Sequence, residues 1–133
     1  MTGVRELHFD TGCFLDIYHG RERIRPYLDA VAAAKLRPTM SVVTEAELWR
    51  GLRAAEVERH ETLLSCFLIL PLRSDAARLA GSWMQSYQSS GLGWMDALIT
   101  ATAKVADVPV LTRDKRLAQV LASEVAFEVY GED

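Results

Sequence analysis

Cysteine and long apolar stretches are the two features that this sequence has least of. Its 133 residues include two cysteines, Cys13 and Cys66, which are too few for a disulfide scaffold or a zinc site built from thiolates. Both lie among apolar residues, so we expect them to be buried thiols. No apolar run approaches the ~20 residues that a membrane-spanning helix needs, and the first residues lack the apolar core of a signal peptide. These absences predict a cytoplasmic protein.

An excess of positive charge is also missing. The chain has 15 Lys and Arg against 18 Asp and Glu, a formal net charge of -3, whereas proteins that coat nucleic acid bind its phosphates with many Lys and Arg. A nuclease is not excluded, because acids gathered around divalent cations would place positive charge where a phosphate must bind.

Repeats, low-complexity tracts and linkers are absent as well. Apolar residues make up 50% of the chain and charged residues 25%, a composition that suits one compact domain with a sizeable core at this length. We therefore expect residues 1–133 to form a single domain.

Short apolar runs alternate with longer segments in which apolar residues recur at helical spacing. Strands are expected at Val4–Phe9, Met40–Val43, Leu68–Leu72, Val108–Thr112 and Val125–Tyr130. Helices are expected from about Gly12, at Arg21–Lys35, Thr44–Ala54 and Glu56–Phe67, from Ser74, and at Trp94–Ala106 and Asp114–Leu121. Pro26 fits a helix only in its first turn and otherwise breaks it, while Pro71 places its strand at an edge or near its end. The alternation predicts an α/β fold with a parallel sheet and helices on both faces.

Three acidic residues follow expected strands. Asp10 comes after the first strand, Glu47 beyond the second and Asp114 beyond the fourth. In an open parallel sheet, ligands bind outside the carboxyl ends of the strands, so acids that are far apart in sequence can converge there. A fourth acid, Asp96, comes instead from the first turn of an expected helix that is apolar on nearly every side.

Each acid also has a purely structural explanation, because the first turn of a helix favours Asp and Glu. Asp10 and Asp114 fit simple N-caps. Thr44 and Glu47 fit a capping box, in which each side chain accepts a hydrogen bond from the other residue's backbone N–H. Taken one at a time, the capping explanations outweigh a catalytic one.

Asp96 fits the structural explanation least well. Its sequence neighbours are apolar, and burying an ionised carboxylate without a partner is very unfavourable. It should therefore be neutralised, hydrogen-bonded or bound to a cation. Carboxylate oxygens suit Mg²⁺ or Mn²⁺, and no cluster of His and Cys suggests structural zinc.

An acidic site of this kind supports in-line displacement at phosphorus, in which a pair of cations activates water and stabilises the leaving oxygen. Asp10 and Asp96 would be the principal ligands, and Asp114 would complete the site. Glu47 would bind a second cation or orient the attacking water.

At these residues the sequence resembles the PIN-domain family, and within it the VapC-type toxins of prokaryotic toxin–antitoxin pairs. The resemblance covers essentially the whole chain. It rests on the order and spacing of five blocks: Phe9-Asp10-Thr11-Gly12, Ser41 to Leu48, Arg50-Gly51, Asp96 to Ala103, and Val110 to Asp114. It implies a three-layer α/β/α fold around a parallel sheet of about four to five strands.

In that family, Asp10, Glu47 and Asp96 match the acidic residues of the active site, and Asp114 matches the usual fourth position. The resemblance also implies Mg²⁺-dependent cleavage of RNA and a homodimer. It further implies inhibition by a small cognate antitoxin whose C-terminal segment lies over the site.

The residues after Asp114 depart from the family pattern. Many relatives carry a further Asp and an aromatic residue a few positions on, whereas here Lys115, Arg116 and Leu117 follow. The sequence therefore favours one bound Mg²⁺ and leaves a second one open.

Basic residues beside the acids are candidates for binding the substrate. Arg113, Lys115 and Arg116 form a short run that can contact RNA phosphate next to the metals or can simply begin a solvated helix. Arg50 lies one helical turn past Glu47, where it can bind phosphate or an acidic antitoxin segment.

Two threonines and two tryptophans complete the set of candidates. Thr11 and Thr112 can hydrogen-bond the acids or metal-bound water, although helix capping explains them nearly as well. Trp49 and Trp83 are expected in the core or in an interface rather than as platforms for stacked bases.

The sequence thus leads to an endoribonuclease toxin, with two alternatives from other classes. One is a protein of the same fold that only binds partners and uses the acids as helix caps. The other is a different Mg²⁺-dependent phosphohydrolase, which is weakened by the lack of a Walker-type glycine loop or an Asp-x-Asp after the first strand. Neither the RNA target nor the antitoxin can be named from the sequence.

Overall fold

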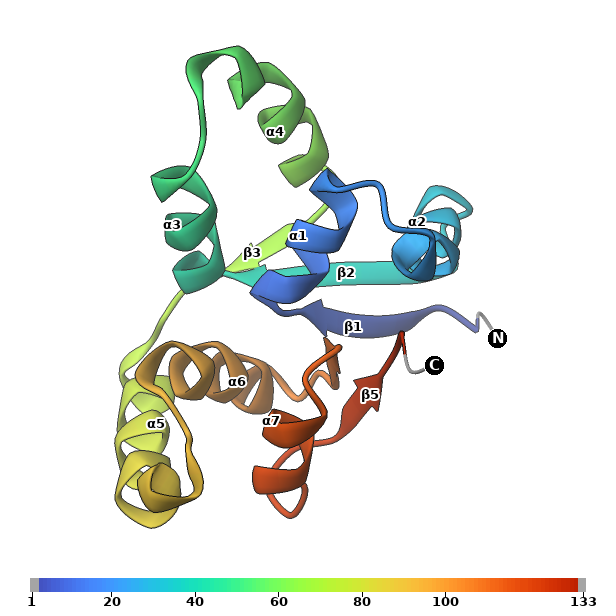
Figure 1. Ribbon diagram of the computed structural model, residues 1–133. Coiled ribbons are helices and arrows are strands. Elements are labelled where there is room, and N and C mark those ends of the chain that lie inside the picture. The colour runs from blue at the N-terminus through green and yellow to red at the C-terminus, as the bar shows by residue number, and fades with distance from the viewer. Residues whose placement is uncertain (1–2, 132–133) are drawn as a thin grey trace.

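Five parallel strands form the centre of the computed structural model, which describes residues 3–131 (Figure 1). They are β1 (Arg5–Phe9), β2 (Leu36–Ser41), β3 (Leu68–Leu70), β4 (Val110–Thr112) and β5 (Phe127–Val129). Their order across the sheet is β3-β2-β1-β4-β5. The predicted α/β class with a parallel sheet is confirmed.

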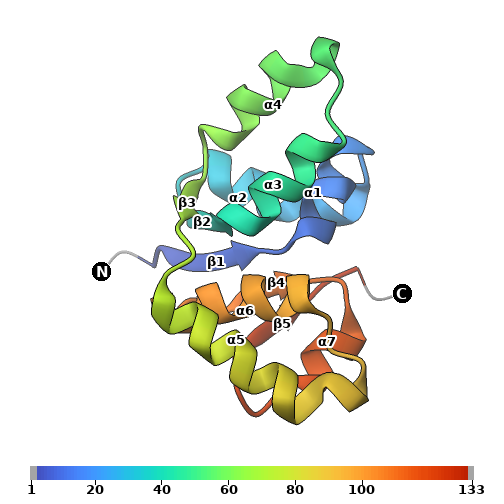
Figure 2. The ribbon, with the colours of Figure 1, turned by 90° about the vertical axis from the view of Figure 1, so that its left-hand side faces the viewer.

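Helices cover both faces of this sheet, as Figure 2 shows. On one side lie α1 (Thr11–Tyr18), α2 (Arg25–Ala32), α3 (Val42–Arg50) and α4 (Val57–Leu64). On the other side lie α5 (Ser74–Tyr87), α6 (Trp94–Ala106) and α7 (Lys115–Val120). Short 3-10 turns occur at η1 (Glu22–Ile24), η2 (Ala54–Glu56) and η3 (Gln88–Ser90). None of the helices between residues 3 and 131 is long and apolar enough to cross a membrane.

Each face of the sheet has its own apolar core. On the first face, Phe9, Phe14 and Phe67 pack together with ring centroids 4.9 to 6.2 Å apart. On the second face, small buried residues of α5 and α6, such as Ala80 and Ala101, lie beside the larger Trp83. Burying a side chain the size of Phe stabilises a fold by roughly 1.5 to 3 kcal/mol. The two cores therefore hold β1, which Asp10 directly follows, and α6, which carries Asp96, in fixed positions.

The strand order creates a switch point beside β1. From β1 the chain proceeds through β2 to β3 in one direction, while β4 and β5 lie on the other side. The register places His8 opposite Val110 and Phe9 opposite Leu111, so β1 and β4 end side by side. Crevices at such points are where open α/β sheets bind ligands.

The prediction for the second strand is wrong at both of its ends. The strand begins at Leu36 rather than Met40, and Ser41 ends it because the Ser41 hydroxyl accepts a hydrogen bond from the Val43 N–H at 3.0 Å. This cap starts helix α3 at Val42. The predicted capping box of Thr44 and Glu47 is therefore wrong as well, since both residues lie inside the helix.

A continuous helix over Arg21–Lys35 is also wrong. The 3-10 turn η1 comes first, and α2 begins at Arg25 with Pro26 in its first turn. Proline fits there because its missing N–H would have no helical partner in any case. The helix ends before Ala34, which has a positive φ of 59°.

Two predictions of burial need correction. The first turn of α6 is open to solvent at Trp94 and Met95, which are 53% and 50% exposed. The last three residues of this helix are exposed as well, so it is buried only between Ala97 and Ala103. Cys66 is exposed in the segment after α4, whereas Cys13 is buried as predicted. Trp83 lies in the core as predicted, while Trp49 is 42% exposed.

Candidate functional site

The carboxyl ends of β1 and β4 are joined by a chain of polar groups. Asp10 directly follows β1, and Thr112 is the fully buried last residue of β4. The Thr112 hydroxyl donates a hydrogen bond to Oδ2 of Asp10 and accepts one from the Asp114 N–H at 3.0 Å. One hydroxyl thereby fixes Asp10 relative to the start of α7, and the predicted contact between Thr112 and an acid is present.

Asp10 and Asp114 both serve as N-caps. Oδ1 of Asp10 accepts from the Cys13 N–H at 3.2 Å, and Oδ1 of Asp114 accepts from the Leu117 N–H at 3.0 Å. Burial raises the pKa of Asp10 and the charge of Asp114 adds to the effect, while hydrogen bonds from Thr112 and Cys13 oppose it. The capping explanation is correct for both residues, yet the two carboxylates also repel each other.

Glu47 reaches the site from α3. The Thr11 hydroxyl at the start of α1 donates to Oε1 of Glu47 at 2.6 Å and lies 3.1 Å from the Thr44 hydroxyl. The predicted contact of Thr11 with an acid is therefore present. Because Glu47 lies inside its helix and caps nothing, its carboxylate has no structural role at a helix end.

Asp96 lies close enough to the other three acids for their charges to act on it. It is partly buried in the first turn of α6, and it lines a small cavity of about 30 Å³ together with Asp114. Burial raises the pKa of Asp96 to about 6, and the charges of Asp114, Asp10 and Glu47 add to this rise. The four predicted acids are thus brought together closely enough to interact.

The side chains of these acids are not arranged as a complete metal-binding site. Between residues 3 and 131, no group of three or more His, Cys, Asp and Glu side chains is arranged to hold a metal ion. Their donor set nevertheless fits a hard cation, because it consists of carboxylate oxygens with hydroxyl groups behind them. A cation would also relieve the repulsion that raises the pKa of Asp96.

Arg113 is bound away from the acids. Its guanidinium donates to the Asp16 carboxylate at 2.8 Å. Asp16 is 2% exposed and also accepts two hydrogen bonds from Arg23, at 2.9 and 3.0 Å, and one from the Tyr130 hydroxyl at 2.8 Å. A contact of Arg113 with RNA phosphate would require its pair with Asp16 to break.

The other predicted basic residues are exposed. Arg50 is the last residue of α3, and Lys115 is the first of α7. Arg116 lines the cavity that contains Asp96 and Asp114. Sequence alone does not distinguish Arg116 from its basic neighbours, because a run of basic residues does not indicate which side chain points toward the acids.

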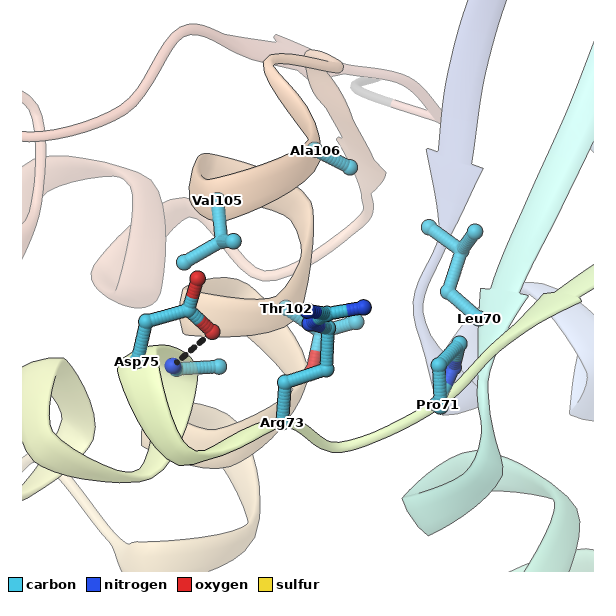
Figure 3. Close-up of a pocket in the computed structure, with 8 residues that line it drawn as sticks. Leu70, Pro71, Arg73, Asp75, Thr102, Val105 and Ala106 are labelled. Carbon is cyan, nitrogen blue, oxygen red and sulfur yellow. Dashed lines mark hydrogen bonds between the residues drawn. The ribbon is translucent and has the colours of Figure 1, made fainter.

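A larger cavity, of about 330 Å³, lies elsewhere in the fold (Figure 3). It is bordered by the link between β3 and α5 and by the last turns of α6, and Asp75 at its wall accepts a hydrogen bond from the Ala76 N–H. None of the four converging acids lines this cavity. We therefore place the candidate site at the acids, where charged groups meet.

Comparison with known proteins identifies the family. The model of the PIN domain matches residues 8–122, which include all four acids and both threonines. The chain belongs to the PIN-domain family. Its three layers and five parallel strands are those of PIN-fold neighbours.

Individual relatives of this PIN domain point in the same direction. "Ribonuclease VapC10" of Mycobacterium tuberculosis is 42% identical over 87 residues, a match that covers 62% of this chain and 64% of that protein. The match therefore spans less than two thirds of the relative. A toxin–antitoxin complex from Klebsiella pneumoniae contains a chain that is 25% identical, with a TM-score of 0.73 over 92% of this chain and 96% of that one. VapBC2 from Rickettsia felis, bound to a DNA fragment from its promoter, shares the fold at 18% identity, with a TM-score of 0.77 and coverage of 95% and 99%.

Proposed function

We propose that this PIN domain is a metal-dependent endoribonuclease and the toxin of a toxin–antitoxin pair. The proposal depends chiefly on the convergence of the acids: Thr112 hydrogen-bonds both Asp10 and the Asp114 backbone, and Asp114 and Asp96 line one cavity. Burial, and in addition the charges of the other three acids, raises the pKa of Asp96. The name of the M. tuberculosis relative supports the ribonuclease activity, although the match covers only part of that protein. Magnesium or manganese is the cation that oxygen ligands of this kind favour.

Asp10, Asp96 and Asp114 are the residues that would hold this cation. A bound divalent cation supplies an acidified water and stabilises the negative charge that develops on the phosphate. Thr112 orients Asp10 through its hydrogen bond to Oδ2. Thr11 holds Glu47 in the same way, through Oε1, and Oε2 of Glu47 would orient the attacking water or bind a second cation.

The cation requirement is tested directly with purified protein and a mixed pool of RNA. We expect cleavage with Mg²⁺ or Mn²⁺ and none with a chelator, because the uncompensated acids repel phosphate. Restoring the metal should restore cleavage. Cleavage that persists in chelator would contradict the proposal.

A protein that binds partners without cutting RNA is the second candidate, and the capping roles of Asp10 and Asp114 favour it. The two candidates differ in their response to metal. A purely binding protein would leave the RNA pool intact with every cation. It would also show no stabilisation by Mg²⁺.

The stability of the fold should depend on pH through the ionisation of Asp96. In the unfolded chain Asp96 has the ordinary pKa of 3.8, and in the fold its pKa is about 6, so the fold binds this proton more tightly. The resulting stability is fully present below pH 3.8 and is lost as the pH rises through about 6. Mg²⁺ competes with the proton, so it should raise the melting temperature clearly at about pH 7.5 and much less at about pH 5. An equal shift at both pH values would contradict this prediction.

The toxin role and its partners form a separate part of the proposal. The Klebsiella pneumoniae structure is a toxin–antitoxin complex, and a small acidic or basic segment lying over the four acids would block the site. We propose a cytoplasmic homodimer that a cognate antitoxin inhibits. Expression of the chain should arrest growth, and co-expression of the product of the neighbouring small gene should relieve the arrest.

A further inference from the structure

We propose that Arg116 is a substrate-binding residue, which contacts an RNA phosphate next to the one that is cleaved. The inference rests on the proposed nuclease function and adds a named anchor for the RNA backbone. It assigns this role to Arg116 rather than to Arg113, although both belong to the same basic run.

The position of Arg116 is the first argument. It lies two residues past Asp114, in the first turn of α7, and lines the small cavity that also contains Asp96 and Asp114. Its guanidinium lies over the turn that precedes α6, where Nη2 is 3.4 Å from the carbonyl oxygen of Ser90. The lining of this cavity therefore combines two acids with a cationic side chain.

The availability of its charge is the second argument. Arg113 is engaged with Asp16 at 2.8 Å, whereas none of the ion pairs formed within residues 3–131 includes Arg116. The planar guanidinium of Arg116 keeps its charge for a ligand from outside.

The geometry of Gly91 is the third argument. Gly91 adopts a positive φ of 96°, and a Cβ on this residue would lie 2.8 Å from Cζ of Arg116. Any larger residue would push the guanidinium off the turn. The absence of a side chain at Gly91 thus leaves room for Arg116 beside the acids.

A cavity lined by carboxylates and by one guanidinium suits a phosphodiester chain. The carboxylates would act on one phosphate through a cation, and a guanidinium in the same cavity lining would match the oxygens of the neighbouring phosphate with two hydrogen bonds. Contacts of this kind position a nucleic acid without reading its sequence. Arg116 should therefore affect the affinity for RNA uniformly across sequences.

The test compares Arg116→Ala with the unmodified protein. For cleavage with Mg²⁺ we expect KM to rise roughly tenfold, the size of one lost charged hydrogen bond, with a smaller change in kcat. For a fluorescent oligouridine in chelator, the slope of log Kd against log salt should become shallower by roughly 0.7. Arg116→Lys should recover part of the affinity. Arg59→Ala, which removes an exposed arginine from α4 on the other side of the sheet, should change neither quantity.

Gly91→Ala provides a second route to the same result. It displaces the guanidinium and leaves its charge in the chain, so KM should rise as in Arg116→Ala, provided that circular dichroism shows an intact fold. Unchanged KM and salt slope in Arg116→Ala, with an unmodified protein that binds and cleaves RNA, would overturn the inference alone. An unmodified protein that neither binds nor cleaves RNA would overturn the proposed function as well.

Discussion

Replacing Asp96 with Asn should reduce kcat for RNA cleavage by roughly a thousandfold, a loss of about 4 kcal/mol of transition-state stabilisation. Burial and the charges of the other three acids raise the pKa of Asp96, and its carboxylate is one of the proposed ligands of the cation. Asn has nearly the same shape but no negative charge. The substitution therefore removes the ligand and leaves the packing of α6 almost unchanged, and single-turnover cleavage of a labelled RNA measures the effect.

Stability separates this result from simple misfolding. In chelator near pH 7.5, the Asp96→Asn protein should be at least as stable as the unmodified protein, because it lacks the repulsion that raises the pKa of Asp96. Asp29→Asn, an exposed change in α2, is the matched control and should retain full activity. Equal cleavage by the Asp96→Asn and unmodified preparations would point to a contaminating nuclease.

Replacing Asp16 with Ala should produce the largest loss of stability, about 3 kcal/mol. Asp16 is buried and accepts four hydrogen bonds, which come from Arg23, Arg113 and Tyr130. Removing one partner of a buried ion pair costs roughly 3 to 5 kcal/mol. We take the lower end, because the side chains of Arg23 and Arg113 are 36% and 39% exposed and can return to water. Urea denaturation measures this loss.

Two milder variants separate the effect of the Asp16 charge on stability from the effect of its hydrogen bond with Tyr130. Tyr130→Phe removes a single hydrogen bond and should cost about 1 kcal/mol. Asp16→Asn keeps an acceptor for Tyr130 but loses the charge, so its cost should lie between the other two. If Asp16→Ala cost less than Tyr130→Phe, the buried carboxylate would contribute nothing beyond its contact with the tyrosine.

The sequence identified the four acids but not their environments. Asp10 and Asp114 could be expected at strand ends because the pattern of strands and helices is strong in this chain. The capping box at Glu47 was wrong because a better cap, Ser41, occurs three residues before Thr44 and starts the helix earlier. Competing caps differ by fractions of a hydrogen bond, and only the packed structure decides between them.

The sequence around Asp16 already indicates that this acid needs a partner. Like Asp96, it is an acid among apolar neighbours in a helix, and the argument that a buried carboxylate needs a partner applies equally to both. In Asp16 the partners are arginines, one of them 97 residues away. A pairing across such a distance depends on the sheet topology, so the sequence could not show that Arg113 would be engaged.

The order of the strands has a consequence for synthesis of the protein. Asp10 receives its hydrogen bond from Thr112, which lies 102 residues further along the chain. At roughly 5 to 20 residues per second, a ribosome needs about 5 to 20 s to cover that distance. Until β4 has emerged and paired with β1, a growing chain carries Asp10, Glu47 and Asp96 without Thr112 and Asp114. If the chain has the proposed ribonuclease activity, the site that cuts RNA is assembled only after Thr112 has been synthesised, close to the end of translation.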